Sequence, residues 1–474
     1  MKGGKFSNLM AGLLAIAVFS GQGCTKGLSP EVQQATKRIE INIWAVNDDT
    51  DVYQKIFSDY HALHPYVTIN YRRLRLEEYE NELLNALAED RGPDIFMVHN
   101  TWISKYLTKM APMPLTTQVA TQAVVGTVKK ETTYVLQTDK SISVKQYKDT
   151  YPDAVIKDTV RVVNVSTNPD KRQLEQRIMS VPMSVDTLAM YVNKDLLNAA
   201  GIATVPTSWS SLQQAVPRLT KQDAQGKLTQ FGAAIGTGYN VERAPDLVAA
   251  LMMQNGSEMS ADDGTPTFNF IPTALRDVRD QPPAYQALAF YTDFANPAKE
   301  VYTWNNEQDN SLDAFLQGRV AFFFGYNYHL PTIRAGAPKL NLGIAQLPQI
   351  EGNPIVNYAN YWTWGVSKKT KYLDTSWNLL NFMIKPEEAK KFLDEAHRPS
   401  AEKSLLPDQL EDEDVGVFAS QVLTSKSWYR GTDPQAMEDA LEEMVNNVLG
   451  GIEDIPTAVK NAASKVGQTV KYSY

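Results

Sequence analysis

Apolar and polar residues follow a repeating order in the first part of the chain. Apolar residues alternate with polar ones at 39–43, recur at helical spacing at 53–60, and alternate again at 67–71. A second stretch of helical spacing at 79–87 precedes an apolar run at 95–98. The order predicts strand, helix, strand, helix, strand. Such a unit forms a parallel sheet whose ligands gather beyond the carboxyl ends of the strands.

Polar and aromatic residues stand at two of these predicted strand ends. Asn47 and Asp48 follow the first strand, and Asn100 and Trp102 follow the third. We therefore expect these side chains at a ligand site. Asp48 has an equally good alternative role, because it precedes a predicted helix and could cap its first turn.

The α/β pattern is interrupted once and then resumes. From 116 to 177 the chain is rich in Thr, Val, Lys and Asp without a strong helical period, so we expect short strands and loops there. Strands are then predicted at 188–192, 231–235 and 320–324, with helices at 194–200, 246–254 and 285–294 and a further helix capped by Ser208. The last quarter is mostly helical, at 377–384, 387–396, 436–449 and 455–470. The predicted fold class is α/β.

The first 23 residues have the pattern of an export signal. Lys2 and Lys5 precede an apolar run of 11 residues that ends at Phe19, and small residues follow up to Cys24. The run is shorter than the roughly 20 residues that a membrane-spanning helix needs. We expect a signal peptide at 1–23, a linker at 24–36 and a location outside the cytoplasm.

Cys24 is the only cysteine of the chain. It resembles the lipid-modified cysteine of a bacterial lipoprotein, although Gly21 stands where an aliphatic residue is usual. Acyl chains on Cys24 would anchor the protein to the cell membrane, in the periplasm or on the outer face. The alternative is a secreted protein with an incidental thiol. With one cysteine, the body must be stable without an internal disulfide.

The net charge limits the class of partner, and the chain length indicates the number of domains. The signal segment holds two lysines and no acids, so its removal takes the formal charge from −8 to −10. This acidic balance argues against nucleic acid as a partner. The remaining chain of about 450 residues exceeds what one hydrophobic core usually serves, so two domains are expected.

Aromatic rings gather beside amides in the later half of the chain, at 326–328 and 361–364. A sugar needs flat rings against its C–H faces and polar side chains that bond its hydroxyls. Candidate ring platforms are Trp102, Tyr239, Trp304, Tyr326, Tyr361 and Trp362, and candidate hydroxyl partners are Asn47, Asp48, Asn100, Asp186, Asn327 and Arg398. Trp44 and Trp377 are expected in the core instead.

Several short motifs occur in a fixed order along the chain. They are Ile41–Trp44, Gly92–Phe96, Tyr191–Leu196, Pro206–Trp209, Phe315–Phe322 and Trp364–Ser367. Together with the lipoprotein-like leader, they resemble the extracellular solute-binding proteins of bacterial sugar ABC transporters, the maltose-binding-like group. The resemblance covers nearly all of the mature chain, and Arg398 resembles a family position near the ligand cleft.

The resemblance implies a two-lobed, periplasmic-binding-protein-like fold of type II. Each lobe would be a mixed sheet flanked by helices, with the ligand in the interlobe cleft and closure by hinge bending. By analogy the first lobe would comprise 37–186 and 352–398, with an extended insertion at about 126–177, and the second lobe 187–351 and 399–474. The implied protein is a monomer that captures a sugar or oligosaccharide and docks on ABC permease subunits.

Two other classes of function stay open at this point. A secreted glycoside hydrolase would need two carboxyl groups about 5–10 Å apart, and no pair stands out in the sequence. No G-x-S-x-G, H-E-x-x-H or Walker motif occurs, and the five histidines show no metal-ligand spacing. A receptor of the same fold could instead bind a polyamine, an anion or a peptide. We expect a non-catalytic receptor without metal or cofactor.

Overall fold

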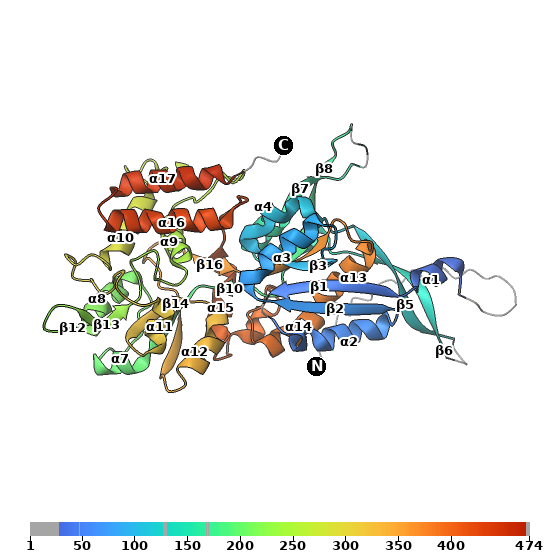
Figure 1. Ribbon diagram of the computed structural model, residues 1–474, viewed down its shortest axis with the longest axis horizontal. Helices are drawn as coiled ribbons and strands as arrows, with labels where there is room; N and C mark the ends of the chain where they lie inside the picture. The colour runs from blue at the N-terminus through green and yellow to red at the C-terminus, as the bar shows by residue number, and fades with distance from the viewer. Residues whose placement is uncertain (1–27, 47, 127–129, 167, 169, 471–474) are drawn as a thin grey trace, which may run out of the picture.

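The computed structural model describes residues 28–46, 48–126, 130–166, 168 and 170–470, and the chain forms two lobes that lie side by side (Figure 1). The sheet of the first lobe has the order β2-β1-β3-β17-β4, with β9 paired to β17. Its strands are β1 (Ile39–Val46), β2 (Val67–Leu74), β3 (Ile95–His99), β4 (Met110–Ala111), β9 (Ser180–Val181) and β17 (Trp362–Ser367). β1, β2 and β3 are parallel, as their sequence pattern predicts, whereas β17 enters antiparallel beside β3.

Helices cover both faces of this first sheet. They include α2 (Gln54–Leu63), α3 (Leu76–Ala88), α13 (Leu373–Met383) and α14 (Pro386–Ala396). Each turns a stripe of apolar residues inward; on α3 the buried residues include Tyr79, Leu83 and Leu87. Trp377 on α13 is fully buried, as its helical spacing predicts.

The second lobe has its own five-stranded sheet in the order β12-β13-β14-β11-β15. The strands are β11 (Ala189–Asn193), β12 (Lys221–Gln222), β13 (Leu228–Ala233), β14 (Val320–Gly325) and β15 (Leu342–Gln346). The helices around it include α8 (Trp209–Leu219), α9 (Ala244–Gln254), α10 (Pro283–Asp293), α16 (Pro434–Leu449) and α17 (Ile455–Gln468). The predicted cap of α8 is confirmed, because Ser208 Oγ accepts the Ser211 N–H at 3.2 Å.

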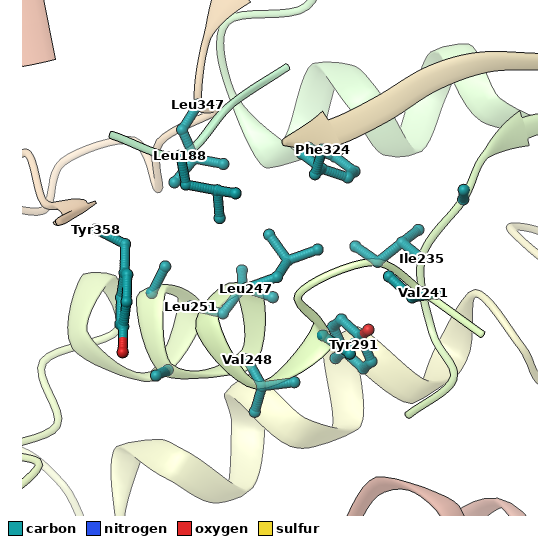
Figure 2. Packing of buried hydrophobic residues seen from close by; sticks show 14 of the residues in the cluster. Leu188, Ile235, Val241, Leu247, Val248, Leu251, Tyr291, Phe324, Leu347 and Tyr358 are labelled. Carbon is teal, nitrogen blue, oxygen red and sulfur yellow. The ribbon is translucent and has the colours of Figure 1, made fainter. Parts of the chain in front are cut away.

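Helix α9 fills the centre of the second lobe, and all of its residues are buried. Figure 2 shows Leu247 on the face of α9 toward Leu188 and Phe324, and Val248 on the opposite face. Nearly all residues of α9 are apolar, which is typical of a core helix, and the buried Asp246 and Gln254 are hydrogen-bonded. The second lobe is therefore built around one helix that contacts the sheet on one side and α10 and α16 on the other.

Three chain crossings join the lobes through a small sheet of order β10-β16-β18. Its strands are β10 (Asp186–Thr187), β16 (Asn357–Asn360) and β18 (Ser425–Lys426), and Figure 1 shows β10 and β16 between the two lobes. The hydrophobic clusters divide at these strands. Ala401, Leu406 and Val415 belong to the first cluster, beyond the lobe boundary expected at residue 398.

The 116–177 region differs from the short strands and loops expected of it. It forms a long hairpin of β5 (Thr116–Val125) and β6 (Glu131–Lys140), two helices, α5 (Val144–Thr150) and α6 (Asp153–Thr159), and a second hairpin of β7 (Val160–Asn164) and β8 (Leu174–Ile178). Both helices have seven residues, which is too short for a helical period to stand out. A capping box at Ser143 and Gln146 marks the start of α5 in the sequence.

Candidate functional site

A cleft of about 700 Å³ lies between the lobes and is lined by residues of both. Trp362, at the start of β17, and His99, at the end of β3, are register partners in the sheet, and Trp102 follows in the next turn. The Trp362 ring lies 5.2 Å from each of the His99 and Trp102 rings, edge to face. These three rings, which we name the aromatic wall, stand where the carboxyl end of a sheet strand predicts a ligand.

His99 is held as a neutral ring in this wall. Its Nε2 donates to Asn360 Oδ1 at 3.0 Å, and its Nδ1 accepts from the Thr101 hydroxyl at 2.8 Å. Burial lowers the pKa of His99 to about 4, because a charged imidazolium would be poorly solvated there. At neutral pH His99 therefore adds a flat surface to the cleft without a charge.

Two charged side chains of the first lobe meet at the hinge end of the cleft. Arg398 Nη2 lies 3.3 Å from Asp48 Oδ1, and both side chains are partly exposed. The Tyr53 hydroxyl donates to the other Asp48 oxygen at 3.4 Å, and the Tyr71 hydroxyl donates to the Asp48 carbonyl at 2.8 Å. The alternative role of Asp48 as a helix cap is wrong, because the first turn begins after Asp49 and has no side-chain cap.

Asp186 connects the hinge to the second lobe. Its carboxylate accepts the N–H groups of Thr187, Asn327 and Tyr328 at 2.8, 3.0 and 3.2 Å. Burial raises the pKa of Asp186 to about 6, even though these donors and Arg398 favour the charged form. A hinge residue thus fixes the loop that carries Tyr328 into the cleft.

The second-lobe wall of the cleft comes from the turn just before α9 and from the first part of α16. Arg243 adopts a left-handed backbone conformation with φ 53° just before α9. Its guanidinium makes two bonds to Asp246, at 2.8 and 3.0 Å, and reaches Glu438 on α16 at 2.7 Å. The Tyr326 hydroxyl donates to Asp246 at 2.7 Å. We name Arg243, Asp246, Glu438 and Tyr326 the polar bridge, since it joins the two helices.

Six of the predicted site residues line the cleft: Asp48, Trp102, Asp186, Tyr361, Trp362 and Arg398. Tyr361 is only 2% exposed and its hydroxyl donates to the buried Asp158 at 2.6 Å, so its ring offers little stacking surface. Trp362 is partly exposed, as a stacking surface must be. Asn47 lies outside the described residues.

The other five predicted residues lie elsewhere. Trp304 is fully buried in the second lobe, where its Nε1 donates to Asn240 at 3.1 Å, and Tyr326 belongs to the polar bridge. Asn100 is turned away toward Asp158, at 3.4 Å. Asn327 is buried and meets Asp186 through its backbone, and Tyr239 is 67% exposed outside the cleft. Four of these five side chains are excluded from the cleft because they are buried, and Tyr239 is excluded because it lies on another part of the surface.

Other cleft residues had no signal in the sequence. His99 stands at a predicted strand end, and this position alone could have identified it as a candidate ligand-site residue. Glu242, Arg243 and Glu438 could not, because they come from a turn and a helix nearly 200 positions apart and are brought together only by packing. In the part of the chain that the structure describes, no group of three or more His, Cys, Asp or Glu side chains could hold a metal ion.

Two α/β lobes, three crossings and a lined interlobe cleft define a binding protein of the two-lobed, hinged class. The sequence profile of the bacterial extracellular solute-binding proteins matches residues 46–390, and the chain belongs to that family. The family that the ordered motifs indicated is thereby confirmed, and so is the two-lobed fold. Membership of an extracellular family places the protein outside the cytoplasm. Within the described ranges, no helix has the length and apolar character to cross a membrane.

Individual relatives are distant in sequence and similar in fold. The chain is 21% identical over 312 residues to the maltodextrin-binding protein MdxE of Bacillus subtilis, a match that spans 64% of this chain and 69% of that protein. It is 22% identical over 302 residues to a putative binding protein of Brucella abortus, with 63% and 69% covered.

Solved structures share the architecture. The GacH receptor of Streptomyces glaucescens, studied unliganded and with acarbose, has a TM-score of 0.65 at 18% identity, with 92% of this chain and 100% of that chain covered. A cyclo/maltodextrin-binding protein complexed with maltotetraose has a TM-score of 0.68 at 15% identity, with 92% and 98% covered. At these identities the likeness shows the fold alone.

Proposed function

We propose that the protein captures a sugar or oligosaccharide in the interlobe cleft and delivers it to an ABC permease by hinge closure. The observation that carries the proposal is the aromatic wall of His99, Trp102 and Trp362, which lines the same cleft as Arg243 and Glu438 of the polar bridge. An open ring face can stack on the C–H face of a pyranose, and the charged groups of the same cleft can bond its hydroxyls.

The size and construction of the cleft agree with such a ligand. Its volume of about 700 Å³ falls inside the range of roughly 300–1,000 Å³ usual for small-molecule sites. Asp48 and Arg398 offer an acceptor and a donor at the hinge end. Relatives that bind maltodextrin, maltotetraose or acarbose share the fold and make a sugar the first class to test.

Binding without catalysis fits the state of the cleft carboxylates. A glycoside hydrolase needs one carboxyl group that holds a proton for the leaving group. Glu438 and Asp48 are each engaged in an ion pair with an arginine, Glu438 with Arg243 at 2.7 Å and Asp48 with Arg398 at 3.3 Å. Both oxygens of Asp186 accept backbone N–H groups and are therefore occupied.

Anchoring and permease docking complete the proposal. Acyl chains on Cys24 would keep the receptor at the membrane, close to its permease. Closure would present both lobes together, so that the permease could distinguish a loaded receptor from an empty one. Globomycin treatment of cells that express the full chain tests the anchor, since it should leave the 1–23 segment uncleaved if Cys24 is processed as in a lipoprotein.

A thermal-shift panel of mono- and oligosaccharides tests the binding claim. A ligand at 100 times its dissociation constant stabilises the folded state by about 2.7 kcal/mol. Polyamines, inorganic anions and short peptides belong in the same panel, because a shift with one of those and none with any sugar would contradict the proposal. Release of shorter sugars during incubation would instead indicate a hydrolase.

A pair of aromatic variants locates the binding site. Trp362→Ala removes the exposed ring of the aromatic wall and should weaken sugar binding by about 2 kcal/mol, roughly 30-fold. Tyr239→Ala removes an equally aromatic side chain that is 67% exposed outside the cleft, and should leave the affinity unchanged. Equal losses in both variants would show that the sugar binds somewhere other than the aromatic wall.

A further inference from the structure

The charges that line the cleft do not balance. Seven carboxylates face it against three cationic side chains. The three cations are already paired: Lys105 with Glu80 at 2.6 Å, Arg398 with Asp48 at 3.3 Å, and Arg243 with Glu438 at 2.7 Å. His99 adds no positive charge, because burial keeps its pKa near 4. The cleft therefore carries an excess of four formal negative charges at neutral pH.

The four remaining carboxylates are those of Glu77, Asp186, Glu242 and Asp433. Among the described residues none of them has an ion pair with Lys or Arg within 4.0 Å. Asp186 and Asp433 accept backbone N–H groups, Asp433 as the cap of α16, so their hydrogen bonds come from neutral donors. Neutral donors satisfy oxygen atoms but leave the charge in place.

Glu242 is the most informative of the four. His329 Nε2 lies 3.6 Å from its carboxylate. However, His329 Nδ1 accepts the Tyr326 N–H at 2.9 Å, so the ring carries one proton and is neutral. The Glu242 side chain is 30% exposed, and the hydrogen bond with His329 lowers the pKa of its carboxyl, with smaller contributions from Asn310 and from the charge of Arg243. Glu242 is therefore a reachable carboxylate of the second-lobe wall that forms no salt bridge with Lys or Arg among the described residues.

The excess of negative charge in the cleft affects the closure of the lobes. Glu77 and Asp186 lie on the first lobe and at the hinge, and Glu242 and Asp433 lie on the second lobe. Closure brings like charges closer and removes water from between them, which strengthens their repulsion. A neutral sugar leaves this repulsion uncompensated, whereas a ligand with an ammonium group would offset it. Tryptophan faces accept a cation as well as a C–H face.

We infer that the preferred solute is a saccharide with free amino groups, whose ammonium meets Glu242 while its ring stacks on Trp362. This inference rests on the proposed sugar-binding function of the same cleft and specifies the class of sugar. A simple polyamine would satisfy the carboxylates but would leave the stacking surface and the hinge-end pair of Asp48 and Arg398 without a partner.

Calorimetry on the full chain at pH 7 with matched sugars tests the inference. The probes are pairs that differ only in the amine: chitobiose against cellobiose, glucosamine against glucose, and galactosamine against galactose, with N,N′-diacetylchitobiose as the neutralised form. We expect at least one amino sugar to bind tenfold more tightly than its hydroxyl and N-acetyl counterparts. Equal or weaker binding of every amino member would overturn the inference and leave the sugar-binding function intact.

Two variants connect the preference to the carboxylate. Glu242→Gln keeps the size of the side chain and removes the charge, and should reduce the ratio of amino-sugar to neutral-sugar affinity at least fivefold. Glu78→Gln removes an equal charge from an exposed position of α3 that does not line the cleft, and should keep the wild-type ratio. The same ratio in Glu242→Gln as in wild type would overturn the role of Glu242. Binding of spermidine with no response to any sugar would overturn the proposed function itself.

Discussion

His99 predicts a specific dependence of stability on pH. Its pKa is about 4 in the folded protein, compared with 6.5 for an unperturbed histidine. Between these values the unfolded chain binds a proton that the folded chain does not, so the free energy of unfolding falls as the pH falls from 6.5 to 4. Each pKa unit corresponds to about 1.4 kcal/mol, so the loss amounts to at most about 3.5 kcal/mol. Above pH 6.5 His99 contributes no pH dependence.

Urea unfolding followed by tryptophan fluorescence can measure this loss at pH 7.5, 6.5, 5.5 and 4.5. Asp186 and Glu442 act in the opposite direction, because burial raises the pKa of these carboxyl groups to about 6 and about 7. The relevant quantity is therefore the difference between wild type and His99→Gln, which keeps a polar side chain at the position. The difference should change steadily with pH below 6.5. A constant difference, or a His99 proton resonance that titrates near pH 6.5, would refute the reasoning.

Three further variants test the assignment of residues to core and bridge. Trp304→Ala opens a cavity in the second lobe and should lower the free energy of unfolding by about 3–5 kcal/mol, measured by urea unfolding. The folded protein should keep its sugar affinity, measured by calorimetry. Arg243→Leu leaves Asp246 and Glu438 without their cation and should cost about 3–5 kcal/mol by urea unfolding, so an unchanged midpoint would contradict the polar bridge. Ser208→Ala removes the cap of α8 and should cost about 1 kcal/mol, visible as a small fall in the thermal midpoint.

The first strands and helices could be predicted because their residues repeat with a strict period. The pattern also placed Asp48 and Trp102 at the cleft, since a strand end determines where the following residues lie. The strand-end rule also predicted Asn100 at the cleft, although only Trp102 lines it. Asn100 turns inward to Asp158, and that carboxylate comes from a helix that the sequence pattern did not reveal.

The residues of the second-lobe wall could not be predicted from the sequence, for a different reason. Arg243 and Glu438 are ordinary charged residues along the chain, and an arginine is usually assigned to a solvated surface. Their role follows from the packing of α9 against α16, which only the three-dimensional structure provides. Conversely, Trp304 and Tyr326 have the ring types of a sugar site but are buried by the core that surrounds them.

The most direct test of the account is the distance between the lobes with and without ligand. Spin labels at Glu78→Cys on α3 and Asp439→Cys on α16, in a Cys24→Ser background, report that distance by pulsed electron resonance, since both positions are exposed. A bound sugar should shift the distance distribution to shorter values, and Trp362→Ala should remove the shift. An unchanged distribution at saturating sugar, or a shift that only a non-sugar solute produces, would contradict it.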